Sequence, residues 1–478
     1  MLPVAALTAP VLAAAETDLL AARWMMALSL GFHIVLACLG VALPTIIWIV
    51  HRRGLRNADH DALLLARRLG KVAAVLFAVG AVSGTVLSFL MGLLWPGLMG
   101  DFGDVIGLAF AFEGIFFFLE AIFLGIYLYG WKGLPARIHL ATLIPIGLSG
   151  VFGTLCILAV NGWMNTPAGF DIDTYLATGE VTDVDPWAAF FNESLWPQFA
   201  HMLPATYVVA GFGTASIFAI GWLRGRRDRL HRLGIVIPLV VGCIAIPIQV
   251  ITGDIVARHV ADTQPAKFAA MEIHEETGPA GLALFGFESG GEIRAKVEIP
   301  GLTSLILDFD PDATVTGLDA IPDDETPPVN VVRFSFQLMI GLGVAMLAAA
   351  AWVGWRWWRT REIPLGDGFV RWVVVALGPA SVLAVWAGWT TTEVGRQPWI
   401  ANGVLRVSDA VTDNTVAPFL AGLIVVYVGL GASAWFVLRR LAARWNAGEE
   451  VATPYGPRPA ATPAGDVDTS PAGRERVR

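Results

Sequence analysis

Charged residues are scarce in this sequence of 478 residues, since Asp, Glu, Lys and Arg together make up only 15% of it. In a soluble chain these four residue types make up about a quarter of all residues. The net charge of −8 supplies no basic field for nucleic acid, so we expect no partner of that class. Cysteine is almost missing: Cys38, Cys156 and Cys243 lie singly in apolar runs, which excludes a disulfide scaffold and a cysteine-bound iron–sulfur or zinc site.

Hydrophobic residues make up 55% of the chain and gather in long runs. A helix of about 20 apolar residues crosses the hydrocarbon core of a bilayer, and inside lipid the backbone must satisfy its own hydrogen bonds. We therefore predict an all-α integral membrane protein with nine transmembrane helices. They are expected at residues 24–50, 72–100, 105–131, 138–164, 195–223, 233–252, 334–355, 372–392 and 416–438.

Basic residues indicate the orientation of these helices. Of the 32 Lys and Arg, 24 lie in the connections after the first, third, fifth and seventh spans and after the ninth. By the positive-inside rule these segments face the cytoplasm. The N-terminus is then outside and the C-terminus cytoplasmic.

Three segments follow from this topology. Residues 1–446 form the transmembrane unit, and within it residues 253–329 form an extracytoplasmic loop with 15 acidic and 4 basic side chains. A loop of this length is usually functional, and one helix is expected after Pro265. Residues 447–478 are rich in Ala, Pro and Gly, which predicts a disordered cytoplasmic tail.

Few ionisable residues remain inside the spans, and such residues are costly in lipid and functional by default. They are His33, Glu113, Glu120, His201 and Glu393, with Arg396 just beyond the eighth span. The topology places His33, Glu113, His201, Met339 and Glu393 in the outer half of the membrane, and Glu120 two helical turns deeper than Glu113.

Two His, a Met and a Glu at similar depth suggest axial ligands of haem, for which His and Met form a known low-spin pair. Taken singly, an intramembrane His is more often a hydrogen-bonding group between helices, and a Met is ordinary packing. The sequence lacks CxxCH, so any haem is bound non-covalently. Glu113 and Glu120 flank the apolar run GIFFFL, where carboxylates can hold and pass protons or simply bond a neighbouring helix.

Several motifs now carry a resemblance to a known family. They are GWTTTEVGRQPW at 388–399, RWMMALSLGFH at 23–33, FEGIFFFLEAIFLGIYLYGW at 112–131, NGWMNTP at 161–167, FAHMLPATYV at 199–208, GD at 253–254 and KFAAME at 267–272. Because all of these motifs occur together and in order along the chain, it resembles subunit I of a cytochrome bd-type quinol oxidase over nearly its whole length up to the tail.

The resemblance implies three haems, with the helices grouped as bundles around them. His201 and Met339 match the ligands of a low-spin haem b, and His33 and Glu393 match ligands of two high-spin haems. These are haem b and haem d, or both haem b, and one of them binds oxygen. Trp389 matches a residue between haems and Arg396 a partner of a haem propionate.

The resemblance also implies a quinol site and a proton route. Lys267 and Glu272, with Asp254 of the GD pair, match residues for quinol, and Glu113 and Glu120 match acids of the proton route and oxygen site. A second large transmembrane subunit is implied, and the family allows a very small single-helix subunit. The expected location is the bacterial inner (cytoplasmic) membrane.

Three departures from the family pattern stand out. Gln337 occupies the place two residues before the ligand Met where many members have Arg, which weakens a propionate contact. Glu113 and Glu120 are seven residues apart rather than eight, which rotates the second acid by about 100°. The 253–329 loop is short, without the long insertion of some members, and together these features resemble the cyanide-insensitive branch.

We therefore expect a terminal oxidase that oxidises quinol at the outer face and reduces oxygen to water with cytoplasmic protons. This arrangement separates charge without a pump. Copper is not expected, since no paired His cluster occurs in the helices. The alternatives are a di-haem membrane electron carrier and a proton-coupled transporter, the latter disfavoured because no internal repeat is visible.

Overall fold

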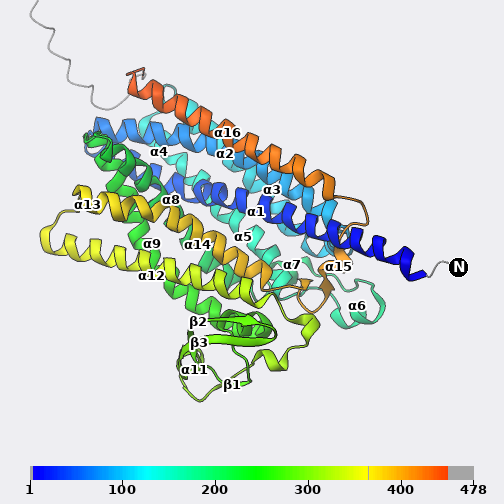
Figure 1. Cartoon of the computed structure of the whole chain (residues 1–478). Helices are drawn as coiled ribbons and strands as arrows, with labels where there is room; N and C mark the ends of the chain where they lie inside the picture. Colours follow the sequence, from blue (N-terminus) through cyan, green and yellow to red (C-terminus); the bar gives the residue numbers. More distant parts are fainter. Residues whose placement is uncertain (1–3, 364, 450–478) are drawn as a thin grey trace, which may run out of the picture.

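Long helices running side by side make up most of the computed structural model (Figure 1). It describes residues 4–363 and 365–449, with side chains from residue 16 onward except at 367. Among these residues nine helical spans are long and apolar enough to cross a membrane, which confirms the predicted fold. The helices of these spans are α1 (Val4–Arg56), α2 (His60–Leu94), α3 (Pro96–Tyr129), α4 with α5 (Ala136–Ala141, Leu143–Asn165), α8 (Leu195–Leu223), α9 (Arg229–Thr263), α12 (Val329–Thr360), η3 with α14 (Val370–Val374, Val375–Val394) and α16 (Ala417–Asn446).

The boundary between the second and third spans was predicted wrongly. We expected one helix over 72–100, but α2 ends at Leu94 and α3 begins at Pro96. Proline has no backbone N–H to continue a helix, fits its first turn, and disfavours the helical conformation in the residue before it. Trp95 accordingly leaves the helical region, with φ −124° and ψ 55°.

The sixth span is longer than the apolar run that predicted it. Helix α9 continues to Thr263, eleven residues past the expected end at 252, so Asp254 lies on this helix rather than in the loop. Helix α10 (Pro265–Glu272) then starts at the expected proline and is two turns long. The tail predicted over 447–478 lies outside the described residues from 450 onward.

The helices pack around several shared cores, one of which joins α1, α2, α3 and α5 to α8 and α9. Helices α1, α2, α3, α5 and α16 contribute to one buried cluster, and α8, α9, α12 and α14 to another. Helices α8 and α9 approach each other closely, since a Cβ on Gly211 would lie 2.6 Å from the backbone nitrogen of Gly242. Only glycine permits this contact, which holds α9 firmly against α8.

The connections fall at two opposite ends of the bundle. Figure 1 shows α4, α13 (Asp367–Phe369) and the C-terminal end of α16 at one end, and α6 (Ile172–Thr178), α7 (Pro186–Phe190) and α15 (Val407–Ala410) at the other. The latter end also carries the short strands β5 (Trp399–Ala401) and β6 (Leu405–Arg406). Successive connections thus alternate between the two ends. The basic connections lie at the end with α4 and α13, and the acidic loop 162–196 lies at the end with α6 and α7.

The acidic connection after α10 forms a small folded cap beside α9 and α12 (Figure 1). Its hairpin pairs β2 (Leu282–Ser289) with β3 (Glu292–Ile299), with Leu282 opposite Ile299. The rest comprises β1 (Gly278–Pro279), α11 (Leu302–Asp308), β4 (Thr314–Val315), η1 (Leu318–Ala320) and η2 (Asp323–Glu325). Ala280, Ala283 and Val315 of this cap share a buried core with α10 and the start of α12. The cap therefore fixes α10 in place.

Candidate functional site

His201 lies on α8 with its imidazole ring against α9. The side-chain nitrogen of Gln249 is 2.9 Å from ring atom Nε2, and the Thr252 hydroxyl is 3.4 Å from Nδ1. A Cβ built on Gly253 would lie 3.2 Å from Cε1 of the ring. One turn of α9 therefore holds this ring, and the missing side chain of Gly253 makes room for it.

Met339 lies on α12 and faces α14. A Cβ on Gly388 would lie only 2.9 Å from the Met339 sulfur. Met339 also packs against the same buried cluster as Val256 of α9, one turn beyond Gly253. His201 and Met339 come from helices far apart in the sequence, and both helices pack against α9.

His33 lies on α1 and faces α2. Its Nδ1 is 3.0 Å from the Ser83 hydroxyl, and a Cβ on Gly84 would lie 2.9 Å from Cε1. His33, His201 and Met339 therefore share one feature, a glycine of a neighbouring helix directly beside the side chain. In each case the missing Cβ makes room for the His or Met side chain itself, so these side chains pack closely on the backbone of the neighbouring helix.

Glu393, near the C-terminal end of α14, is held from two sides. Its Oε1 accepts a hydrogen bond from Asn161 Nδ2 at 2.7 Å, and its Oε2 accepts one from Arg396 at 2.6 Å. Arg396 is 4% exposed, and its Nε and NH1 atoms lack hydrogen-bond partners among the described residues. Buried donors without partners are rare, so Arg396 has two donors available for an acidic group such as a haem propionate.

Trp389 lies one turn before Glu393 on α14. It packs against the buried cluster of Ile34, Cys38 and Val209, which belong to α1 and α8. Ile34 follows His33 directly in the chain. Trp389 is thus placed between the helix that carries His33 and the helix that carries His201.

Lys267 is buried on α10, with 3% of its surface exposed. Its amine donates hydrogen bonds to the side-chain oxygens of Gln264 and of Asn165, the latter at 3.1 Å. Its aliphatic part lies on Gly395, where a Cβ would be 2.7 Å from Lys267 Cγ. Burial lowers the pKa of Lys267 to about 7, and the charge of Arg396 acts in the same direction.

Glu272, five residues further along α10, is also buried. Burial raises its pKa to about 7, although the positive charge of Arg333 opposes the rise. Arg333 NH1 lies 3.8 Å from Glu272 Oε2 and donates to the Met271 carbonyl at 2.8 Å. Lys267 and Glu272, both on this short helix, can therefore each gain or lose a proton near neutral pH.

The remaining predicted residues lie apart from α10. Glu113 and Glu120 are half-buried on one face of α3, and a Cβ on Gly40 of α1 would lie 3.7 Å from Glu120 Oε1. Asp254 is exposed and pairs with Arg258 at 2.9 Å. No contact of Asp254 with Lys267 or Glu272 is found among the described residues.

Sequence reasoning missed several residues of this site. Arg333 received no role, although an arginine inside an apolar stretch is itself a signal. Asn161 and Asn165 were quoted only as letters of the NGWMNTP motif, yet their spacing of four already places them on one helix face. Gln337, noted as a departure, donates to the Ala283 carbonyl at 2.8 Å and so binds the cap.

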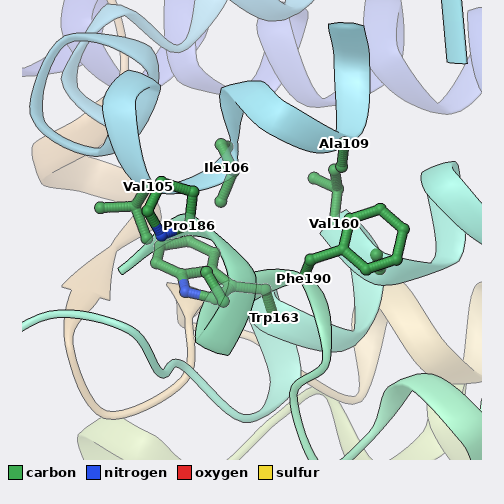
Figure 2. A pocket seen from close by; sticks show the side chains of 9 residues that line it. Val105, Ile106, Ala109, Val160, Trp163, Pro186 and Phe190 are labelled. Carbon is green, nitrogen blue, oxygen red and sulfur yellow. The ribbon is translucent and has the colours of Figure 1, made fainter. Parts of the chain in front are cut away.

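Two pockets lie outside this set of residues. Figure 2 shows the first, an apolar pocket between α3, α5 and α7 with Ile106, Val160 and Phe190 in its wall. The second is an apolar groove between α12 and α14 that includes Trp352 and Trp372. Neither contains a predicted site residue, so the candidate site rests on the buried polar contacts described above.

Comparison with known proteins relates the whole chain to one family. The family described as cytochrome bd terminal oxidase subunit I matches residues 21–445. A putative cytochrome bd menaquinol oxidase subunit I of Bacillus subtilis is 32% identical, over 88% of this chain and 96% of that protein. A cytochrome bd-II ubiquinol oxidase subunit 1 of Escherichia coli is 28% identical, over 85% and 92%.

A solved structure agrees with these sequence matches. The bd oxidase from Geobacillus thermodenitrificans superposes with a TM-score of 0.82 at 35% identity. The match covers 89% of this chain and 98% of that one. The arrangement of helices is thus similar over nearly the full length of both chains.

Proposed function

The chain belongs to the cytochrome bd terminal oxidase subunit I family, and from this premise we propose that it oxidises quinol beside α10 and draws protons for oxygen reduction from the opposite face of the membrane. It is a quinol:oxygen oxidoreductase and a multi-pass membrane protein of the respiratory chain. The observation that carries the proposal is the pair of buried groups Lys267 and Glu272, whose pKa values both lie near 7.

Family membership implies haem, and the proposed ligands fit it. His201 and Met339 would hold a low-spin haem b, while His33 and Glu393 would each hold one of two high-spin haems, with haem b or haem d at the oxygen site. The unpartnered donors of the buried Arg396 support this assignment. When bound, these groups supply electron transfer and the reduction of oxygen.

Quinol oxidation releases two protons, which need acceptors. The Glu272 carboxylate is the proposed acceptor of both protons, one after the other, and the Lys267 amine holds a quinol oxygen by a hydrogen bond. Both groups are enclosed, so the quinol hydroxyl reaches the Lys267 amine by replacing one of its present partners, Gln264 or Asn165.

Protons for oxygen reduction come from the other side in this proposal. Glu120 and Glu113 lie on one face of α3, two turns apart, so that a proton passes from the deeper carboxylate toward the outer half. By the positive-inside rule, the arginine-rich connections support a cytoplasmic position for their end of the bundle. Uptake on one side and release on the other generates a proton motive force without a pump.

Partners and location follow from the family and from the surface. A second large membrane subunit, and in some complexes a small single-helix one, would cover part of the outer faces. Phe89, Phe118 and Phe419 are each more than 60% exposed on α2, α3 and α16, which suits contact with lipid or with such a subunit. The proposed location is the bacterial cytoplasmic membrane.

The test is Glu272→Gln in the purified oxidase complex. Gln keeps the shape of the side chain but cannot take up a proton, so quinol-driven oxygen consumption should fall by about 10²-fold or more. A redox dye that reduces the haems directly should support the parent rate. The matched control is Glu276→Gln, an exposed carboxylate four residues further on, which should leave both rates unchanged.

If Glu272→Gln lowered the quinol-driven and the dye-driven rates of oxygen consumption equally, the proposed role of Glu272 at the quinol site would be wrong. A carbon monoxide difference spectrum separates the oxidase from the two alternatives. Haem bands without a carbon monoxide shift would indicate an electron carrier, and a complex without haem bands would leave only the transporter.

A further inference from the structure

A chain of buried hydrogen bonds joins Lys267 of α10 to Glu393 of α14. It passes through two amide side chains of α5, those of Asn165 and Asn161. Lys267 donates to Asn165 Oδ1 at 3.1 Å, Asn165 Nδ2 reaches Asn161 Oδ1 at 3.4 Å, and Asn161 Nδ2 donates to Glu393 Oε1 at 2.7 Å. Residues far apart in the sequence thereby form one continuous polar contact.

The direction of these bonds is determined by their two ends. With Lys267 in its ammonium form, the lysine only donates and the Glu393 carboxylate only accepts, so each amide turns its oxygen toward Lys267 and its nitrogen toward Glu393. Asn165 is 1% exposed and Asn161 9%, and buried amides are costly unless they are bonded. Asn165 Nδ2 also donates to the Asn161 carbonyl at 2.9 Å, which anchors it to the last turn of α5.

Asn165 is the partner of Lys267 that is distant in the chain. Gln264, the other partner, lies three residues before the lysine, at the junction of α9 and α10, whereas Asn165 belongs to α5, a separate transmembrane helix. The lysine stem is confined on its far side by Gly395. The place of the amine relative to the bundle therefore depends on the Asn165 oxygen.

We propose that Asn165 is a positioning residue for quinol oxidation, which sets the place of the Lys267 amine through its side-chain oxygen. The inference rests on the proposed role of Lys267 in quinol binding. Asn165 acts through the lysine and does not touch quinol itself. A misplacement of about 1 Å in such a site costs on the order of 10²-fold in rate.

Three variants of the whole oxidase complex test this inference. Asn165→Ala removes the oxygen and should lower quinol-driven oxygen consumption by about 10-fold or more, with the dye-driven rate within about twofold of the parent. Asn165→Asp keeps an oxygen that accepts from Lys267 but loses the amide donor to Asn161, so its quinol rate should lie between those of the parent and Asn165→Ala. Asn192→Ala is the matched control, because this buried amide donates to the backbone carbonyls of Ala159 and Ala189.

A double-variant cycle separates this inference from the proposed function. In a Lys267→Met background, Asn165→Ala should cause less than about a twofold further loss, because the two residues act as one unit. A full additional loss in that background would overturn the positioning role, as would a normal quinol rate in Asn165→Ala. A rate for Asn165→Asp as low as that of Asn165→Ala would also overturn it.

Lys267→Met measured alone tests the premise. If it oxidises quinol normally, the proposed role of Lys267 fails, and the positioning role fails with it. If it is slow while Asn165→Ala is normal, only the inference fails. Haem content measured by pyridine haemochrome shows whether each variant is assembled, and the Asn165→Asp variant keeps the test decisive if the Ala variant does not assemble.

Discussion

Replacing Arg333 with Met tests whether the charge state of Glu272 controls quinol oxidation. Met keeps the apolar length of the side chain and removes its charge. The guanidinium lies 3.8 Å from the Glu272 carboxylate, and both side chains are buried. At an effective dielectric constant of about 20, this pair attracts by about 4 kcal/mol, equivalent to roughly three pH units.

The direction of the change follows from the pKa of Glu272. Burial has already raised it to about 7 against the opposing charge of Arg333. Without that charge the carboxyl stays protonated to higher pH. If the carboxylate accepts the quinol proton, the acid limb of the pH–rate profile should move upward by at least about one unit.

The assay is quinol-driven oxygen consumption across the pH range, with the dye-driven rate as an internal reference. Arg406→Met is the matched control, since Arg406 pairs with Asp324 on the exposed surface at 2.7 Å, where ion pairs contribute little. An acid limb that stays in place in Arg333→Met, with normal haem content, would refute the reasoning. Glu272→Gln/Arg333→Met should lack that limb altogether.

Thermal stability gives a second measure of the same pair. Removing one partner of a buried ion pair costs about 3–5 kcal/mol, because the other charge is left alone. The pKa of Glu272 is higher in the folded state than in the unfolded state. The contribution of this group to stability is therefore largest below its unfolded-state pKa and is lost as the pH rises through about 7. The Tm of Arg333→Met should therefore fall more at alkaline than at acidic pH.

Two further substitutions test other parts of the site. His201→Ala should remove the low-spin haem band from the reduced-minus-oxidised spectrum and leave the high-spin bands, and persistence of that band would exclude His201 as a ligand. Gly395→Ala places a Cβ 2.7 Å from Lys267 Cγ, so overpacking should cost about 1–3 kcal/mol and displace the amine from Asn165. Its quinol-driven rate should fall, whereas Gly100→Ala, with nothing within 4 Å of the added atom, should not change; equal rates in the two would contradict the packing argument.

The nine spans could be predicted because a membrane imposes a minimum length of apolar chain, and that length is visible in the sequence. Boundaries were less certain where chemistry other than hydropathy decides them. The Leu94–Pro96 break depends on a proline inside an apolar run. The extension of α9 to Thr263 depends on polar residues, such as His259, that tertiary contacts accommodate: its Nε2 lies 2.8 Å from the Ser194 hydroxyl.

By itself, the sequence determined which residues are unusual in lipid and which segments carry the charge. His33, His201, Glu113, Glu120 and Glu393 were conspicuous because an ionisable group in hydrocarbon is expensive. Only the tertiary structure decided how such groups meet: that Lys267 bonds Asn165, 102 positions earlier in the chain, and that glycines lie beside the proposed ligands. A pattern along one chain records spacing within a helix, whereas contacts between helices depend on how their surfaces pack.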